Sequence, residues 1–497
     1  MAPHVGRYGG AKETEQSQRR WGCRSAALYR GSGGTKPKGP RGGKAEPEHG
    51  PLEGTTGETL SSQTVTTKLE RIANMAKQVP AVLTTLAHYI DIDWLHEAHR
   101  RTRKDGARGV DGQSAEQYER DLESNLKSLL DRAKAGTYRA PPVRRVYIPK
   151  GDGQERPLGI PTYEDKMLQR AVAMVLEAVY EQEFLDCSYG FRPGRSAHQA
   201  LGVLRDTVME MRGAWVLEVD VRKFYDTIDH AQLRTVLGRR IGDGVILRLI
   251  GKWLHAGVME EGEWKRADAG TPQGGVISPI LANVFLHVVL DTWFEREVLP
   301  RLSGRARLVR YADDFVIAFD EEQDARRVME VLPKRFGKFD LTLHPDKTRL
   351  VRFHPPSDDR KGDDDGDEGG TGTFDLLGFT HFWKKSQRGH WVVQVKTAKS
   401  RLSLALKRFS DWCRKHRHRP VAEQWKTLTA KLRGHNAYFG IIGNAGALLV
   451  IRHAAYRIWR QWLNRRSQRA RVIWAAMRQL HERYPLPRLP VLRSLRA

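Results

Sequence analysis

Apolar residues recur along this chain with two periods, and each period predicts a different kind of element. At residues 72–86 the apolar positions follow the helical spacing, and Pro80 predicts a break or kink there because proline lacks an amide hydrogen. A charged helical region with a glycine-rich turn follows at 94–138. Between Tyr147 and Phe353, short β-branched runs alternate with longer helical patterns. This stretch therefore predicts an α+β core built around a small sheet.

Beyond Trp391 the spacing of apolar residues is helical again. Three separate stripes predict three amphipathic helices with basic outer faces, and such helices form a bundle. The stripes are Leu402, Leu406, Phe409 and Cys413; Trp425, Leu428 and Leu432; and Leu448, Ile451, Ala455, Ile458 and Trp462.

Two segments lack a core-forming pattern. Residues 1–62 are rich in Gly, Lys, Arg, Glu and Pro and contain few large apolar residues. Burial in such a segment cannot offset the entropy lost on ordering, so we expect it to be disordered. We expect the acidic, glycine-rich insertion at 358–372 to be a mobile surface loop. Ordered structure should begin near Val65.

The charge of the chain is concentrated toward one end. The 497 residues carry 84 Lys and Arg against 59 Asp and Glu, a formal net charge of +25. Residues 384–497 hold 27 of the Lys and Arg but only three acids. A well-solvated surface is one interpretation. A polyanion partner accounts better for such one-sided charge, because each neutralised phosphate releases counterions, and we therefore expect a nucleic acid.

Cysteine content and hydropathy narrow the setting. Cys23, Cys187 and Cys413 are far apart in the chain and suit neither a disulfide framework nor a four-thiolate zinc site, so we expect a reducing, cytoplasmic environment. No uninterrupted apolar stretch approaches 18 residues, and the N-terminus has no signal-peptide core. We therefore expect a soluble protein.

Two acidic positions interrupt apolar, β-favouring runs. Asp313 and Asp314 lie side by side within residues 307–319, and their apolar flanks predict a hairpin with the acids at its tip. Asp220 ends another apolar strand within residues 215–230. Each position has an ordinary alternative, since paired aspartates are common in turns and an acid after a strand is often a helix cap.

If the two strands bring these acids together, three carboxylates form a site made only of oxygen ligands. Such ligands suit Mg²⁺. Two such ions polarise an attacking hydroxyl and a leaving pyrophosphate at once. Phosphoryl transfer requires mainly positioning and charge neutralisation from a protein. The pair of motifs is therefore more specific than either motif alone.

These motifs belong to a longer series of sequence blocks that resembles a known family. The blocks general to reverse transcriptases are LEVDVRKFYDTID (217–229), TPQGG (271–275) and YADD (311–314). The blocks typical of intron-encoded members are FRPGRSAHQA (191–200) and LRGHNAYFG (432–440). From about Asp105 to Tyr484 the chain resembles the group II intron-encoded reverse transcriptase/maturases of bacterial type.

The resemblance implies an α+β right-hand polymerase followed by an all-α domain. The expected segments are a disordered basic extension at 1–62, reverse transcriptase fingers and palm at 63–385, a helical thumb and maturase domain at 386–464, and a short basic DNA-binding tail at 465–497. Many family members carry a zinc-associated HNH endonuclease with cysteine pairs at the C-terminal end. No cysteine follows Cys413, so we expect no endonuclease here.

The resemblance also implies a catalytic metal site. Asp220, Asp313 and Asp314, with the Val221 carbonyl, are the expected catalytic ligands of two Mg²⁺ ions, for which Mn²⁺ is an expected substitute. The second acid of the YADD pair has an alternative role that is mainly electrostatic. Two further acids of the same block begin a helical pattern, which favours capping or surface roles; they are Asp226 and Asp229.

Other residues are implied to bind nucleotide, primer or RNA. The expected nucleotide-binding residues are Lys150, Arg156, Tyr225, Phe224, Gln273 and Lys347. Tyr225 or its neighbour Phe224 would exclude a ribose 2′-hydroxyl, and Lys347 is either a general acid or an exposed lysine. The LLGF turn at 376–379 resembles a hairpin that holds the primer end, although apolar packing also accounts for it. The expected RNA contacts are Arg433, His435 and Asn436.

The implied function is that of an RNA-directed DNA polymerase that also binds its parent intron RNA and assists its splicing and mobility. The expected partners are group II intron RNA, an RNA template with a DNA primer, target DNA and deoxynucleoside triphosphates, without a membrane; a homodimer remains open. One alternative is a maturase with an inactive polymerase site, against which the intact acids argue. Another is a reverse transcriptase of phage defence or retron synthesis, against which the 432–440 block argues.

Overall fold

The computed structural model describes residues 56–149, 155–260, 262–265, 270–271, 274–356 and 372–495. Several predictions therefore lie outside the described residues: the disorder of 1–55, the roles of Lys150 and Gln273, and the mobility of the insertion through residue 371. The fold is α+β, as predicted. No described helix is long and apolar enough to span a membrane.

A four-stranded sheet, which we call the central sheet, has the order β6-β7-β3-β8. Its strands are β3 (Ala214–Val219), β6 (Ala306–Tyr311), β7 (Asp314–Phe319) and β8 (Arg349–Phe353). All neighbouring pairs are antiparallel. Strands β6 and β7 form the predicted hairpin, with Tyr311 opposite Asp314, so the prediction of two acids at a hairpin tip is confirmed.

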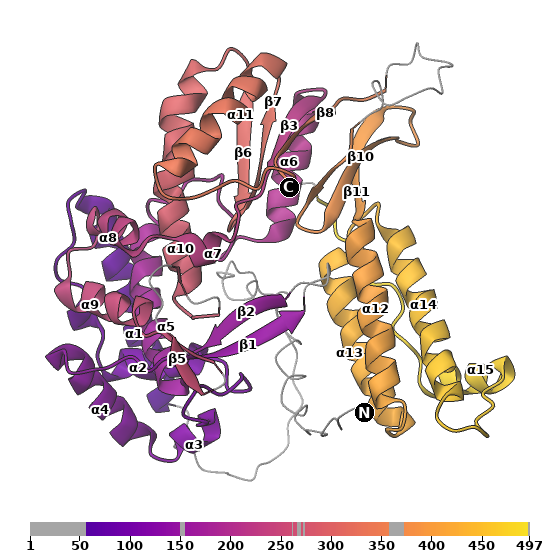
Figure 1. Ribbon diagram of the computed structural model, residues 1–497, viewed down its shortest axis with the longest axis horizontal. Helices are drawn as coiled ribbons and strands as arrows, with labels where there is room; N and C mark the ends of the chain where they lie inside the picture. The colour runs from indigo at the N-terminus through magenta and orange to yellow at the C-terminus, as the bar shows by residue number, and fades with distance from the viewer. Residues whose placement is uncertain are drawn as a thin grey trace, which may run out of the picture.

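Helices cover both faces of the central sheet (Figure 1). Successive side chains of a strand point to opposite faces. On β7, Phe315, Ile317 and Phe319 accordingly pack in the core that includes α11 (Glu322–Gly337), and Val316 and Ala318 pack in the core that includes α6 (Ala197–Glu210). The central sheet is thus buried on both sides, which explains its nearly continuous apolar strands.

Helices and the first two strands of a second sheet precede the central sheet in the chain. The helices are α1 (Thr56–Gln78), η1 (Ala87–Tyr89), α2 (Ile92–Arg101), α3 (Ala115–Glu119), α4 (Leu122–Ala135) and α5 (Tyr163–Tyr180). Helix α1 ends before Pro80, which confirms the predicted break, and it begins inside the 1–62 segment. The second sheet has the order β2-β1-β4-β5, with β1 (Val143–Pro149), β2 (Glu155–Ile160), β4 (Val258–Glu260) and β5 (Glu263–Lys265).

The helices between β3 and β6 connect these two sheets. They are α7 (Phe224–Thr227), α8 (His230–Gly238), α9 (Gly244–Leu254), α10 (Ser278–Leu286), η2 (His287–Asp291), η3 (Phe294–Val298) and η4 (Leu299–Arg301). The η2 and η3 segments are π-helical. Asp229 caps α8 by accepting from the Gln232 amide, which confirms the capping role predicted for that acid.

A third sheet, β11-β10-β9, lies between the central sheet and a helical bundle. Its strands are β9 (Phe374–Leu376), β10 (Phe379–Lys385) and β11 (Trp391–Thr397). The bundle consists of α12 (Lys399–His416), α13 (Val421–Phe439), α14 (Ala445–Asn464) and α15 (Trp474–Arg483). The first three are the helices that the apolar stripes predict.

The segment predicted as a tail contains α15 and then returns along the bundle toward the central sheet. The Trp425 Nε1 donates to the Pro485 carbonyl at 2.9 Å, and the Ile442 amide donates to the Arg493 carbonyl at 2.9 Å. A Cβ at Gly202 of α6 would lie 2.5 Å from the Leu495 carbonyl oxygen, so glycine is required for this approach. The segment therefore packs on the fold, and its binding of DNA stays a prediction.

Candidate active site

A two-residue turn places the acids at the tip of the β6–β7 hairpin. Tyr311 pairs with Asp314, so Ala312 and Asp313 form the turn itself. Ala312 has a φ of +57°, in the left-handed region that L-residues other than glycine rarely adopt. Asp313 therefore projects from a strained turn, and Asp314 begins β7.

Asp220 is the residue that follows β3. Strand β3 pairs with β7 through Val219 and Phe315, and the same register continued by one residue sets Asp220 opposite Asp314. The chain then leaves the sheet: the Asp220 carbonyl accepts from the His344 amide at 2.8 Å, and Val221 forms a bridge with Leu343. The two strand ends thus bring the three predicted acids to one edge of the central sheet.

The three carboxylates repel one another electrostatically. Burial, followed by the charges of Asp313 and Asp220, raises the pKa of Asp314 to about 7. The Asp314 side chain is exposed to solvent on one side. The protein atoms that surround the rest of the carboxylate are what raise its pKa. Burial also raises the pKa of Asp313, against the opposing effect of the Arg156 charge. An excess of negative charge on oxygen ligands is the environment that a divalent cation neutralises.

The donor set therefore fits divalent cations. In the described part of the chain, no three His, Cys, Asp or Glu side chains are already arranged as a metal centre. The Lys347 ammonium lies beside one of the three acids: its Nζ is 3.0 Å from Asp220 Oδ2. Lys347 belongs to the loop that precedes β8. The contact therefore places this lysine, which is predicted to act on the pyrophosphate leaving group, beside Asp220.

The two aromatic candidates of the 217–229 block are distinguished by burial. Phe224 is 2% exposed and belongs to the main core, whereas Tyr225 is only partly buried. Burial raises the pKa of Tyr225, and the charge of Asp313 raises it further. The Tyr225 carbonyl accepts from the Thr271 amide at 2.7 Å, so the TPQGG block begins against this residue.

The residues predicted to contact RNA lie on α13 in different environments. Arg433 is exposed, so its contact with RNA stays a prediction. Asn436 is 8% exposed, and the ring of His435 packs against Phe439 with centroids 4.5 Å apart. Burial lowers the pKa of His435 to about 4. Asn436 is therefore buried and His435 partly buried, and their contact with RNA stays a prediction.

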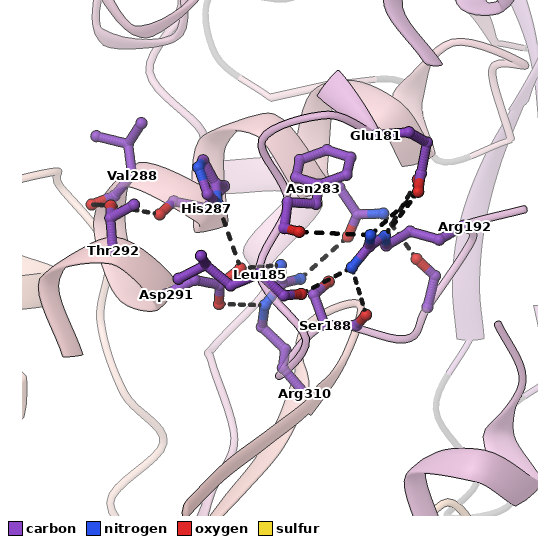
Figure 2. A network of polar contacts seen from close by, with 12 residues as sticks. Glu181, Leu185, Ser188, Arg192, Asn283, His287, Val288, Asp291, Thr292 and Arg310 are labelled. Atoms are coloured by element: carbon purple, nitrogen blue, oxygen red, sulfur yellow. Dashed lines mark hydrogen bonds and ion pairs between the residues drawn. The ribbon is translucent and has the colours of Figure 1, made fainter. Parts of the chain in front are cut away.

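Sequence reasoning missed a buried ionic network behind the hairpin turn (Figure 2). Arg310 and Asp291 are both fully buried and form an ion pair. Asn283 joins them by accepting from Arg310 Nη1 at 3.0 Å. The signal in the sequence was an arginine and an aspartate, each inside an apolar run, which is costly unless the charges are paired.

Sequence reasoning also missed the contacts that hold the 376–379 turn. Leu377 has a φ of +53°, and its carbonyl accepts from the Tyr438 hydroxyl of α13 at 2.8 Å. The Tyr438 carbonyl in turn lies 2.7 Å from His198 Nε2 on α6. His198 belongs to the FRPGRSAHQA block and Tyr438 to the LRGHNAYFG block, so the two blocks typical of intron-encoded proteins meet in space.

Comparison with known proteins places this geometry in context. Residues 148–381 match the family model described as reverse transcriptase (RNA-dependent DNA polymerase). The chain is 36% identical to Protein YkfC of Escherichia coli (strain K12) over 299 residues, which cover 52% of this chain and 76% of that protein. It is 37% identical over 308 residues to the group II intron-encoded protein LtrA of Lactococcus lactis subsp. cremoris, covering 59% of this chain and 50% of LtrA.

A more distant relative is nuclear intron maturase 2, mitochondrial, of Arabidopsis thaliana, 28% identical over 231 residues, which cover 38% of this chain and 30% of that protein. The chain thus matches about half the length of LtrA and most of the length of YkfC.

Proposed function

We propose, from the premise that this chain belongs to the reverse transcriptase family, that it extends a DNA primer on an RNA template by two-metal nucleotidyl transfer. We also propose that it binds its parent group II intron RNA and assists splicing and mobility. The observation that carries the first proposal is the placement of Asp220, Asp313 and Asp314 at the adjacent ends of β3 and the β6–β7 hairpin. Burial, and after it the charges of Asp313 and Asp220, raise the pKa of Asp314.

In the proposed reaction Asp220, Asp313, Asp314 and the Val221 carbonyl hold two Mg²⁺ ions, for which Mn²⁺ substitutes. The ions supply charge neutralisation at the primer 3′-hydroxyl and at the leaving pyrophosphate. The protein contributes orientation. Arg156 binds the triphosphate through its fork of donors.

Two further side chains act on the substrate in this proposal. Lys347 Nζ, which lies on Asp220, donates a proton or a hydrogen bond to the leaving pyrophosphate. Tyr225, which is partly buried and accepts from the Thr271 amide through its carbonyl, excludes a ribose 2′-hydroxyl and so selects deoxynucleoside triphosphates. Lys150 and Gln273 complete the proposed nucleotide contacts.

The proposal of intron binding rests on the charge of the helical bundle. Residues 384–497 carry 27 Lys and Arg against three acids, and Arg433 of α13 is exposed. Structured RNA is recognised largely through its shape, phosphates and exposed bases, which such a surface suits. The names of LtrA and of the plant maturase support the same partner. Target DNA, a cytoplasmic location with association to the nucleoid during mobility, and a homodimer belong to the same proposal.

Asp313→Ala tests the division of labour between polymerase and RNA binding. Loss of this carboxylate should abolish primer extension on poly(rA)/oligo(dT), because the metal site loses a central ligand, while binding of the flanking intron RNA and assisted splicing at low Mg²⁺ stay within twofold. Asp346→Ala is the matched control, since Asp346 is an exposed acid near the site. Loss of both activities in Asp313→Ala would refute the proposal, and a wild-type protein that binds RNA without extending a primer would support an inactive polymerase site.

The exposed arginines after α14 provide a second test, directed at nucleic-acid binding. Arg469→Gln/Arg471→Gln removes two charges from residues that are exposed in the structure. Each lost phosphate contact should flatten the slope of log Kd against log salt by about 0.7 to 0.9, so the pair should change it by up to about 1.8. Arg326→Gln on α11, also an exposed arginine, is the control. An unchanged slope in the double variant would contradict the assignment.

A further inference from the structure

The ion pair behind the hairpin turn is fully buried. Arg310 Nε donates to Asp291 Oδ1 at 2.7 Å, and Arg310 Nη2 donates to Asp291 Oδ2 at 2.5 Å. Both side chains have no solvent exposure. Figure 2 shows Asn283 and Asp291 directed from their helix toward the Arg310 guanidinium. The guanidinium is thus held on two sides by groups from a single helical segment.

The local helix geometry explains how two residues so far apart in sequence reach one guanidinium. In a regular α-helix, eight residues turn about 80° beyond two full turns, which would direct Asn283 and Asp291 to different faces. The segment His287–Asp291 is π-helical, with wider turns than an α-helix. The wider turn reduces the angular offset, and Asp291 comes onto the face that carries Asn283.

Stability alone does not account for this pair. Two charges taken from water lose hydration, and well-packed apolar residues of the same volume commonly give equal or greater stability. What apolar residues cannot do is donate hydrogen bonds. The remaining nitrogen, Arg310 Nη1, donates to the Asn283 side chain and to the Ala312 carbonyl, each at 3.0 Å. The pair therefore delivers an oriented donor to the turn that carries Asp313.

The turn needs such a donor because it is strained and closely enclosed. Ala312 is left-handed, and a Cβ at Gly190 would lie only 2.3 Å from the Ala312 amide nitrogen. The Gly190 carbonyl is fixed by Asn283 Nδ2 at 2.7 Å. Arg310 thus holds the carbonyl of the Ala312 residue, while Asn283 holds the backbone that packs against its amide. The two contacts together define the conformation of the turn.

We propose that Arg310, oriented by Asp291 and Asn283, is a positioning residue that fixes the Ala312 peptide and thereby the direction in which Asp313 meets the catalytic metal ions. The inference rests on the proposed function, because it assigns Asp313 to that metal site. Groups that orient metal ligands from behind commonly contribute tenfold or more to metal affinity or to activity. Arg310 does this through the backbone of the turn.

The decisive variant is Arg310→Met/Asp291→Leu, which removes both charges together and keeps the interior filled. It should fold, bind template–primer without divalent ions within threefold of wild type, and show kcat for primer extension lower by about 100-fold with little change in the KM for deoxynucleotide. Mn²⁺ binding, followed by the electron paramagnetic resonance signal of the free ion, should weaken by about tenfold. The Mn²⁺ titration reads the site without requiring turnover.

The matched control is Arg240→Met/Glu183→Leu. Arg240 is also a buried arginine that pairs with a glutamate and donates to backbone carbonyls, but these belong to the end of α1 and the residues after it. This control should change stability without changing kcat or Mn²⁺ affinity. Equal effects of the two double variants on kcat and Mn²⁺ binding would overturn the proposal.

Arg310→Lys keeps the charge and decides the case if the double variant does not fold. Lysine lacks the planar fork that joins Asp291, Asn283 and Ala312 at once, so kcat and Mn²⁺ affinity should fall in the same direction. Unchanged Mn²⁺ affinity and kcat in a folded variant would overturn the positioning role. A wild-type protein that binds Mn²⁺ but extends no primer would instead contradict the proposed function, and the Mn²⁺ comparison between variants would still test the turn.

Discussion

Two turns of this protein begin with a left-handed residue but are held by different chemistry. Ala312, in the β6–β7 turn, and Leu377, between β9 and β10, both adopt a left-handed φ, +57° and +53° respectively. In each turn a side chain donates to the carbonyl of the left-handed residue. At Ala312 the donor is the buried guanidinium of Arg310, and at Leu377 it is the hydroxyl of Tyr438, a neutral group on the helical bundle.

The charge of the donor determines how each turn responds to the loss of a hydrogen-bond partner. A left-handed residue other than glycine costs about 1–2 kcal/mol, so both turns need support from their surroundings. A buried charged donor requires its counterion, and the arrangement is therefore nearly all-or-none. A neutral, partly exposed donor exchanges its partner for water at small cost. The β6–β7 turn is thus firmly fixed, whereas the 376–379 turn has a donor that is more easily replaced.

Breaking the charged support should have the largest effect. Asp291→Ala leaves the Arg310 guanidinium buried without its counterion, and we expect the free energy of unfolding to fall by about 3–5 kcal/mol. Urea denaturation measures this change. Asp291→Leu combined with Arg310→Met should recover most of the loss, because no charge then remains buried. A loss below about 1 kcal/mol in Asp291→Ala would contradict the all-or-none behaviour.

Asp165 is a buried carboxylate that, unlike Asp291, accepts hydrogen bonds from neutral donors. Asp165 is 1% exposed and accepts from Trp253 Nε1 at 3.0 Å and from the Tyr138 hydroxyl. Burial raises the pKa of Asp165 to about 7, so the folded protein retains a proton that the unfolded chain releases near pH 4. The stability that this proton contributes is complete below about pH 4 and is lost as the pH rises through 7.

We therefore expect thermal melts to show a fall in Tm between pH 4 and pH 7 that is smaller in Asp165→Asn than in wild type. The asparagine keeps an oxygen that accepts hydrogen bonds and never ionises. Asp131→Asn, at an exposed position of α4, is the control and should leave the pH dependence unchanged. Parallel pH profiles for wild type and Asp165→Asn would show that burial without a cation does not make a carboxylate pH-sensitive in this fold.

The sequence predicted those parts of the fold and site that depend on local pattern. Apolar runs located the strands of the central sheet, and the acids at their ends indicated where Asp220, Asp313 and Asp314 would meet. The pairing of Arg310 with Asp291 could not be predicted in the same way. It depends on a π-helical turn and on which buried charge faces which, and neither leaves a periodic signal.

The same reasoning explains the differences in the C-terminal region. The helix α15 has a single fully buried residue, Met477, so its apolar pattern was too weak to predict a helix within the tail. Asn436 and His435 are implied RNA contacts by the resemblance of the 432–440 block. In the structure Asn436 is buried and the His435 ring packs against Phe439 of the same helix, so their contact with RNA stays a prediction. The hydrogen bond from the Tyr438 hydroxyl to the Leu377 carbonyl joins residues 61 positions apart, and such a contact is visible only in the folded structure.

Breaking the neutral support should have the smallest effect. Tyr438→Phe removes the hydroxyl that donates to the Leu377 carbonyl and keeps the ring against Phe379, so the free energy of unfolding should fall by about 1 kcal/mol. If the 376–379 turn holds the primer end, template–primer should dissociate about twofold to fivefold faster from this variant. The kcat for a single nucleotide addition should stay within twofold, because the β6–β7 turn is unaffected. Stopped-flow dissociation and single-turnover extension separate these quantities. Tyr456→Phe removes a hydroxyl from the bundle at α14 and should change neither rate. A loss of stability in Tyr438→Phe as large as that in Asp291→Ala would contradict this comparison. The two turns would then be equally rigid, and the chemistry of the donor would not determine how firmly a turn with a left-handed residue is held.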